Sequence, residues 1–186
     1  MRKQIHSVSV TLKAGLLSGL IMLTPLFAAA QKAHPPAGHQ HSASATLVQH
    51  VRAATQQFFD VNNATALGYG PFAGCVSGPD HGAMGIHYVN PNYLNGQVNL
   101  SQPPALIYEP SNGALKLVGV EYIVDAATWL ASNQGPPVLD GQVFLFVGAP
   151  NRYNLPAFFE LHVWAWRDNP QGAFVDWNNH VSCEGQ

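Results

Sequence analysis

Three ionisable residues interrupt apolar segments of the chain, and their types are those that bind metal ions. His87, Glu121 and His162 each stand within a short apolar run that predicts a β-strand. An unpaired charge inside a strand costs several kcal/mol, so such a residue pairs, accepts hydrogen bonds or binds an ion. Imidazole and carboxylate groups from separate strands can together hold zinc, copper, iron or manganese. We therefore predict a buried site for one divalent metal ion; the alternative is a His and a Glu that hydrogen-bond only to each other.

The last predicted strand carries further candidates. Side chains alternate along a strand, so Glu160, His162, Trp164 and Trp166 are expected on one face. We expect Glu160 to point into the same cavity as His162. If the protein is an enzyme, Glu160 or Glu109 is the expected proton-transfer group. The two tryptophans are expected either to form the wall of a ligand pocket or to pack in the core.

Two more ionisable residues stand close in sequence to the predicted strands. His81 is in a glycine-rich loop before the first strand, and Glu109 is at the end of the second strand, directly before Pro110. Both are candidates for ligand binding. The simpler alternatives are that His81 is a solvated loop residue and that Glu109 caps the turn.

Hydrophobic patterning predicts one helix followed by strands. Apolar residues recur at three- and four-residue steps from residue 45 to 60, as in an amphipathic helix that could extend to Leu67. Short apolar runs separated by turn residues then predict strands at 84–90, 104–109, 115–126, 142–147 and 157–167. We expect an α+β fold in which this N-terminal helix packs on a strongly curved antiparallel sheet or small barrel of five or six strands.

The N-terminal part of the chain predicts export. Residues 1–30 combine basic residues, an apolar stretch and a small-residue cleavage site, as in a signal peptide. Residues 31–44 form a His/Pro-rich leader, expected to be flexible, and residues 45–186 a single globular domain. The leader histidines are either solvated or able to capture metal. The predicted location is the periplasm or the exterior, with no stable membrane anchor after cleavage of the signal.

Charge and cysteine content narrow the partners. The chain has 8 Lys and Arg against 10 Asp and Glu, and three of the basic residues belong to the predicted signal. Nucleic acid is therefore not an expected partner, because no basic stripe can replace condensed counterions. The two cysteines, Cys75 and Cys183, are expected to form a disulfide bond in an exported protein. The sequence does not indicate an oligomeric state.

Two resemblances bear on the setting of the protein. The segments Gly82–Asn90, Leu115–Tyr122 and Leu161–Phe174 resemble an uncharacterised group of exported bacterial proteins, which implies an extracytoplasmic setting and no particular activity. The order His, Glu, His along successive strands is also similar to the cupin metal site. The paired His-x-His of cupins is missing, since Met84 and Gly85 precede His87. This resemblance implies a small barrel with an inward His and Glu site.

These expectations lead to one main functional hypothesis with alternatives. The main hypothesis is an exported protein whose buried His/Glu pocket binds a divalent metal or a small ligand. If the protein is catalytic, we expect a metal-dependent enzyme. Metal-assisted hydrolysis and oxygen chemistry are then the classes to test. The alternatives are a non-catalytic binding module with an aromatic-lined pocket, and a structural protein with a satisfied His–Glu pair. The chain has no Gly-x-Ser-x-Gly elbow, phosphate-binding glycine loop or dinucleotide fingerprint.

Overall fold

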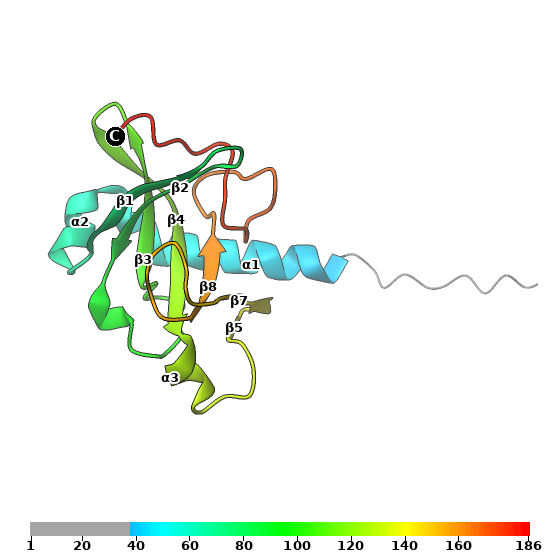
Figure 1. Cartoon of the computed structure of the whole chain (residues 1–186). Coiled ribbons are helices and arrows are strands. Elements are labelled where there is room, and N and C mark those ends of the chain that lie inside the picture. The colour runs from blue at the N-terminus through cyan, green and yellow to red at the C-terminus, as the bar shows by residue number, and fades with distance from the viewer. Residues whose placement is uncertain (1–37) are drawn as a thin grey trace, which may run out of the picture. The chain divides into compact units, whose positions relative to one another are not determined.

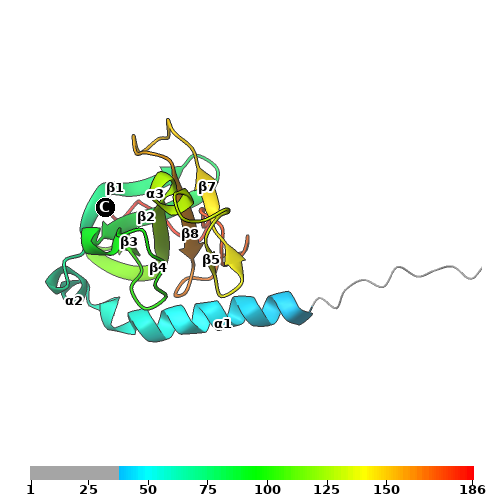
Figure 2. The same cartoon turned by 90° about the horizontal axis from the view of Figure 1, so that it is seen from below.

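The computed structural model describes the backbone of residues 38–186 and the side chains from residue 45 onward. The predicted signal peptide and the first part of the predicted leader lie outside these residues. Helix α1 spans Gly38–Thr55 and lies along one face of a sheet (Figures 1 and 2). It begins before residue 45 because the apolar periodicity marks only the part that packs on the sheet, where Leu47 and Val51 are fully buried.

The predicted single helix is divided into three pieces. The 3₁₀-helix η1, Gln56–Phe59, follows α1, and a second α-helix, α2, spans Val61–Ala66. Asp60 separates the two because its backbone is extended and its side chain accepts a hydrogen bond from the backbone N–H of Asn62. This is a helix N-cap, which starts a new helix instead of continuing the old one.

A six-stranded antiparallel sheet forms the rest of the framework, in the order β1-β2-β3-β4-β8-β7. The sheet is curled into a half-barrel (Figure 1), which confirms the predicted fold class. Its strands are β1 Gly70–Gly78, β2 Gly82–Val89, β3 Ala105–Ser111, β4 Ala114–Asp125, β7 Leu145–Val147 and β8 Phe158–Val163. Outside the sheet are η2 Pro91–Tyr93, α3 Ala126–Leu130 and a small hairpin of β5 Val138–Leu139 and β6 Gln142–Val143.

Three strand predictions differ from the structure. No strand was predicted over residues 70–78, where glycines and a proline are typical of turns; the segment is β1, an irregular edge strand with register shifts against β2. The predicted strand 142–147 is divided between β6 and β7. The predicted strand 157–167 ends at Val163, after which regular pairing with β4 stops, although the Trp166 N–H still donates to Val118 O.

A β-bulge changes which residues of β4 share a face. Ile107 on β3 is paired with Gly119, and the next residue, Tyr108, with Leu117, so Val118 is the extra residue. Beyond the bulge the alternation is reversed. Strict alternation would place Leu117 on the same face as Glu121, but Leu117 packs in the main core with Val120.

The main core lies between α1 and one face of the sheet. Leu106, Tyr108, Val120, Tyr122 and Val163 are each at most 1% exposed there. The buried tyrosine hydroxyls donate hydrogen bonds to backbone carbonyls outside the sheet; that of Tyr108, for example, bonds to Phe58 O at 2.8 Å. Apolar packing therefore occupies this face, and the ionisable residues of the strands lie on the other.

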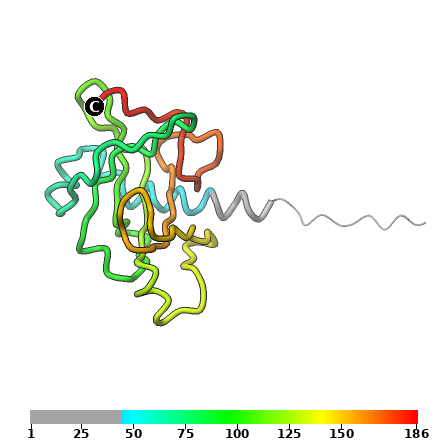
Figure 3. Tube along the Cα trace, viewed as in Figure 1, coloured from blue at the N-terminus to red at the C-terminus, as the bar shows by residue number. Residues whose placement is uncertain are grey.

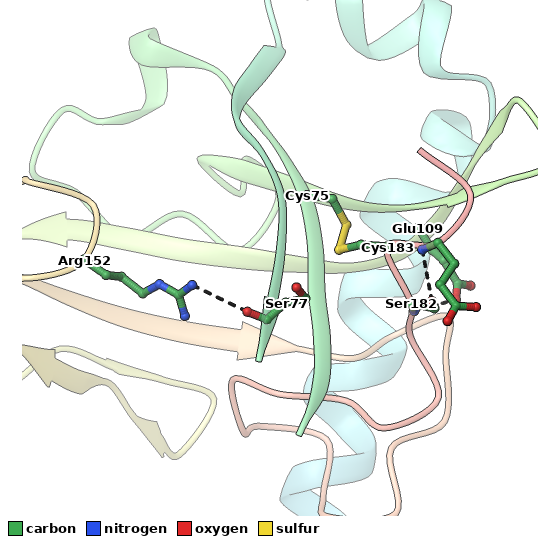
Figure 4. The surroundings of a disulfide bond; sticks show 7 residues. Cys75, Ser77, Glu109, Arg152, Ser182 and Cys183 are labelled. Carbon is green, nitrogen blue, oxygen red and sulfur yellow. Dashed lines mark hydrogen bonds between the residues drawn. A yellow bond between two sulfur atoms is a disulfide. The ribbon is translucent and has the colours of Figure 1, made fainter. Parts of the chain in front are cut away.

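The C-terminal segment is tied back to the sheet. Cys75 on β1 and Cys183 form the predicted disulfide bond, 108 residues apart in sequence (Figure 4). Such a crosslink stabilises a fold by about 2–4 kcal/mol. Glu109 accepts a hydrogen bond from the backbone N–H of Ser182 at 3.1 Å, and the chain ends beside the β3–β4 hairpin (Figure 3). Over the described residues 38–186, no helix is both long enough and apolar enough to cross a bilayer.

Candidate metal centre

The three predicted metal ligands lie on one face of the sheet, opposite α1. Glu121 on β4 is directly paired with His162 on β8. His87 on β2 is joined to β4 through Ile107, which is paired with both His87 and Gly119. Directly opposed residues of antiparallel strands point to the same side. The sheet therefore brings the three side chains together, although 75 positions separate the first from the last.

The distances fit a shared ion. His87 Nε2 lies 3.2 Å from Glu121 Oε2, and the two imidazole ring centres are 5.7 Å apart. One ligand atom from each of His87, Glu121 and His162 lies within 4.8 Å of the others. Donors bound to one zinc ion at 2.0–2.2 Å are separated by about 3–4 Å, so small side-chain adjustments would suffice. The residues are only 7%, 4% and 1% exposed, respectively.

Gly119 leaves room for the part of the chain that holds His162. A Cβ atom at this position would lie 2.8 Å from the carbonyl oxygen of Val163 and 3.4 Å from the ring of Trp164. Trp164 thus packs over the gap and stacks on His162, with ring centres 6.0 Å apart and an angle of 27° between the planes. The stacked indole fixes the orientation of the imidazole ring.

A second group of ligand atoms shares His162. Glu160 and Asp176 each place a carboxylate oxygen within 4.8 Å of an imidazole nitrogen of His162 and of each other. Glu160 is two residues before His162 on β8 and so lies on the same face of the sheet. Asp176 comes from the irregular segment after β8, which has no periodic pattern, so the sequence analysis missed it. Because the two groups share one imidazole, they describe neighbouring positions of one centre.

His162 has two unsatisfied ring nitrogens. Among the described side chains, the buried polar atoms without a hydrogen-bond partner are His162 Nδ1, His162 Nε2 and Asp176 Oδ1. The Nδ1 atom lies 3.6 Å from Asp176 Oδ1, which is too long for a good hydrogen bond. A buried polar group left unpaired costs about 1–3 kcal/mol. An ion bound to one of the two ring nitrogens would remove this cost for that nitrogen.

Burial keeps both histidines neutral. Loss of water contact lowers the pKa of His87 to about 4, an effect that the nearby Glu160 carboxyl only partly opposes. Burial, with a contribution from His87, holds the pKa of His162 well below its usual value. A neutral imidazole has the free lone pair that metal binding requires, so neither residue must lose a proton at neutral pH.

Burial shifts the pKa values of the three nearby carboxyl groups in the opposite direction, upward. Burial raises the pKa of Glu121, of Glu160 and of Asp176, and the charge of Glu121 raises that of Glu160 further. Glu160 lies close to both Glu121 and Asp176, so the protonation of each carboxyl affects the pKa of its neighbours. Concentrated buried negative charge of this kind is relieved by protonation or by a cation.

A cavity of about 480 Å³ opens onto the site. His87 and Glu121 line it, whereas His162, Glu160 and Asp176 do not. Tyr153 is the other lining residue with a polar side chain, and the rest are apolar or glycine, including Val76, Val89, Leu94, Ile123, Leu155 and Phe158. The size is that of a small-molecule site.

The loop between β7 and β8 closes one side of this cavity. It contributes Tyr153, whose hydroxyl donates to Met84 Sδ at 3.3 Å, and Leu155. The neighbouring Arg152 lies over the ring of Trp177 and reaches Ser77 O on β1 at 3.5 Å (Figure 4). Since β1 and β7 are the two edge strands, the loop bridges the open side of the half-barrel.

Four other predicted site residues lie away from the cavity. His81 is exposed and is 6.5 Å from Trp177 by ring centres. Glu109 holds Ser182 and lies 3.5 Å from the Arg167 guanidinium. Trp164 donates to Val175 O, and Trp166 packs on Phe59 and donates to Thr55 Oγ1. The two tryptophans do not form a common wall because β8 ends before them.

Comparisons of the chain with protein-family models, with curated proteins and with solved structures give no match. The functional argument therefore depends on the geometry of the site.

Proposed function

We propose that the protein binds one divalent transition-metal ion through His87, Glu121 and His162 and uses the adjoining cavity for a small-molecule ligand. The observation that carries this proposal is the buried, doubly unsatisfied imidazole of His162 beside two further ligand residues. Two imidazoles and one carboxylate are a donor set used by zinc and by non-haem iron. The disulfide and the N-terminal sequence support a periplasmic or secreted location.

The arrangement also favours an open coordination position. His87 and Glu121 face the cavity, so an ion held with His162 would have protein on one side and the cavity on the other. A catalytic zinc ion typically has three protein ligands and one exchangeable position. The ion would supply a Lewis acid and lower the pKa of a bound water. Hydrolysis is thus the first activity to test, and oxygen chemistry the second.

Glu160 is the group that we expect to transfer protons in such a hydrolytic site. Its carboxyl is buried, its pKa is raised by burial and by Glu121, and it hydrogen-bonds to that ligand. A carboxyl that stays protonated near neutral pH can donate a proton, and after donation it can accept one. In the proposed enzyme, Glu160 is the proton-transfer residue.

The alternative of a satisfied His–Glu pair explains less. The 3.2 Å contact of His87 with Glu121 would fit it. It does not account for His162, whose two ring nitrogens are buried without partners, or for the cavity next to the pair. The non-catalytic binding module has the support of the apolar cavity, although Trp164 and Trp166 do not line it.

Metal analysis of the full exported chain tests the proposal. His34, His39 and His41 are replaced by alanine in every version, so that the leader cannot contribute, and no affinity tag is used. We expect about one equivalent of metal in this protein, detected by mass spectrometry after zinc or iron reconstitution. We expect less than a tenth of this in His87→Ala/His162→Ala.

A matched double variant separates the site from histidine content. His81→Ala/His180→Ala also removes two histidines, and both of these are exposed. We expect it to retain the metal. The proposal is wrong if the unmutated site stays empty after reconstitution, or if both double variants lose metal equally.

A further inference from the structure

The cavity beside the metal centre has a strong division between its inner end and its mouth. At the inner end are His87 and Glu121, which are 7% and 4% exposed. At the mouth are the exposed lining side chains Phe72, Leu94 and Leu155, which are 41%, 45% and 37% exposed. Apolar side chains lie between, among them Ile123.

This division determines the kind of molecule that fits. Apolar walls favour an apolar body, because each buried methylene group contributes about 0.8 kcal/mol. A polar group along the body would lose its hydration without finding a partner, which costs at least about 1–3 kcal/mol. Polar partners at the inner end are an imidazole nitrogen and a carboxyl oxygen, which a hydroxyl group can satisfy because it both donates and accepts.

Tyr153 does not change this conclusion. Its hydroxyl hydrogen is used in the contact with Met84 Sδ, and burial beside the acidic groups raises its pKa to about 12, so the group is neutral and offers a ligand only an acceptor. The ring therefore adds apolar surface to the wall next to Phe158, with ring centres 6.5 Å apart.

We propose that the cavity takes a small, mainly apolar alcohol that enters with its hydroxyl group toward His87 and Glu121 and leaves its apolar end between Leu94 and Leu155. This rests on the proposed function in that the hydroxyl would occupy the side of the metal centre that faces the cavity. It adds the chemical class of the ligand and its direction of binding.

The first test is a series of straight-chain alcohols from 1-butanol to 1-octanol, titrated into the full chain and followed by two-dimensional NMR. We expect the affinity to rise up to about fourfold per added methylene group, until the cavity is filled. Hexane-1,4-diol, whose second hydroxyl would face the apolar wall, is expected to bind at least tenfold more weakly than 1-hexanol. Equal affinity across the series, or for the diol and 1-hexanol, would overturn the proposal.

Two variants at the mouth test the direction of binding. Leu94→Asp and Leu155→Asp are expected to fold, because both side chains are already partly exposed, and to weaken 1-hexanol binding at least tenfold. The control is Leu130→Asp, since Leu130 is 48% exposed and does not line the cavity. Contacts between the terminal methyl of 1-hexanol and the leucine methyls, measured as nuclear Overhauser effects, should be seen at Leu94 or Leu155. The absence of such contacts at both leucines in the bound state would contradict the proposed direction.

The same titrations in metal-free and zinc-loaded protein distinguish the two proposals. Alcohol binding without any zinc binding would overturn the metal centre and leave the cavity assignment standing. Stoichiometric zinc binding without alcohol binding would overturn the cavity assignment and leave the metal centre standing.

Discussion

The Nδ1 atom of His162 lies 3.6 Å from Oδ1 of Asp176, so an imidazole on the last long strand of the sheet faces a carboxylate from the irregular C-terminal segment. Metal-bound histidines commonly donate their second ring N–H to a carboxylate, which fixes the tautomer and the ring orientation. Asp176 has this position relative to His162, and the stacked Trp164 restrains the same ring. The centre is therefore supported from outside the sheet as well as within it.

The first prediction concerns Asp176 as a positioning residue. Asp176→Asn should weaken zinc binding by about 10- to 100-fold, because it removes the charge that orients and polarises His162. Isothermal titration calorimetry measures the change. Asp168→Asn is the control, since this exposed residue is on the same segment. Unchanged affinity in Asp176→Asn would show that Asp176 does not act through His162.

The second prediction concerns the buried carboxyl of Glu160. In metal-free protein its raised pKa means that the folded state keeps a proton that the unfolded chain loses above about pH 4.5. As the pH rises from about 4.5 toward the folded-state pKa of about 10, the wild type should therefore lose stability relative to Glu160→Gln by at most about 1.4 kcal/mol per pH unit. The two proteins should converge below pH 4.5. Urea unfolding at several pH values measures this difference.

A matched exposed glutamate provides the control for that experiment. Glu184→Gln alters a side chain at the exposed C-terminus, so its stability should follow the wild type at every pH. Added zinc should reduce the difference between Glu160→Gln and the wild type, since a nearby cation favours the ionised carboxyl. A pH-independent difference would show that Glu160 is not proton-linked to folding.

The third prediction concerns His87, whose contribution to stability should change with pH in the opposite direction to that of Glu160. The pKa of His87 is lowered to about 4, so between about pH 6.5 and 4 the unfolded chain gains a proton that the folded state does not. The contribution of His87 to stability is thus lost as the pH falls through this window. His87→Gln should gain stability relative to the wild type on acidification, and His81→Gln, at an exposed site, should not. Parallel curves for all three proteins would contradict this account of His87.

The sequence predicts the sheet-borne part of the site better than the rest. His87, Glu121, Glu160 and His162 were found because a charge within an apolar strand is a local signal, and the sheet brings these strands together as neighbours. Asp176 has no such signal. Its position depends on how the C-terminal segment folds back, which is a tertiary property.

The errors in the predicted elements have similar causes. The faces of β4 depend on a bulge at Val118 that a period of two cannot reveal. The wall role considered for Trp164 and Trp166 required β8 to continue with regular alternation. The regular strand ends at Val163, and the next backbone bond to β4 is from Trp166 to Val118 O. Strand ends of this kind are decided by packing against neighbours and not by local preference.

The last prediction concerns Gly119, which connects the fold to the metal centre. A Cβ at this position would lie 2.8 Å from Val163 O, a backbone atom that cannot move without displacing the end of β8. Gly119→Ala should destabilise the protein by about 1–3 kcal/mol, as expected for overpacking. It should also weaken zinc binding, because Trp164 and the stacked His162 must shift with the strand. Gly135→Ala is the control, since a Cβ there meets no atom within 4 Å. Thermal unfolding and zinc titration of both variants measure the two effects. Loss of stability with unchanged zinc affinity would mean that Trp164 does not position His162.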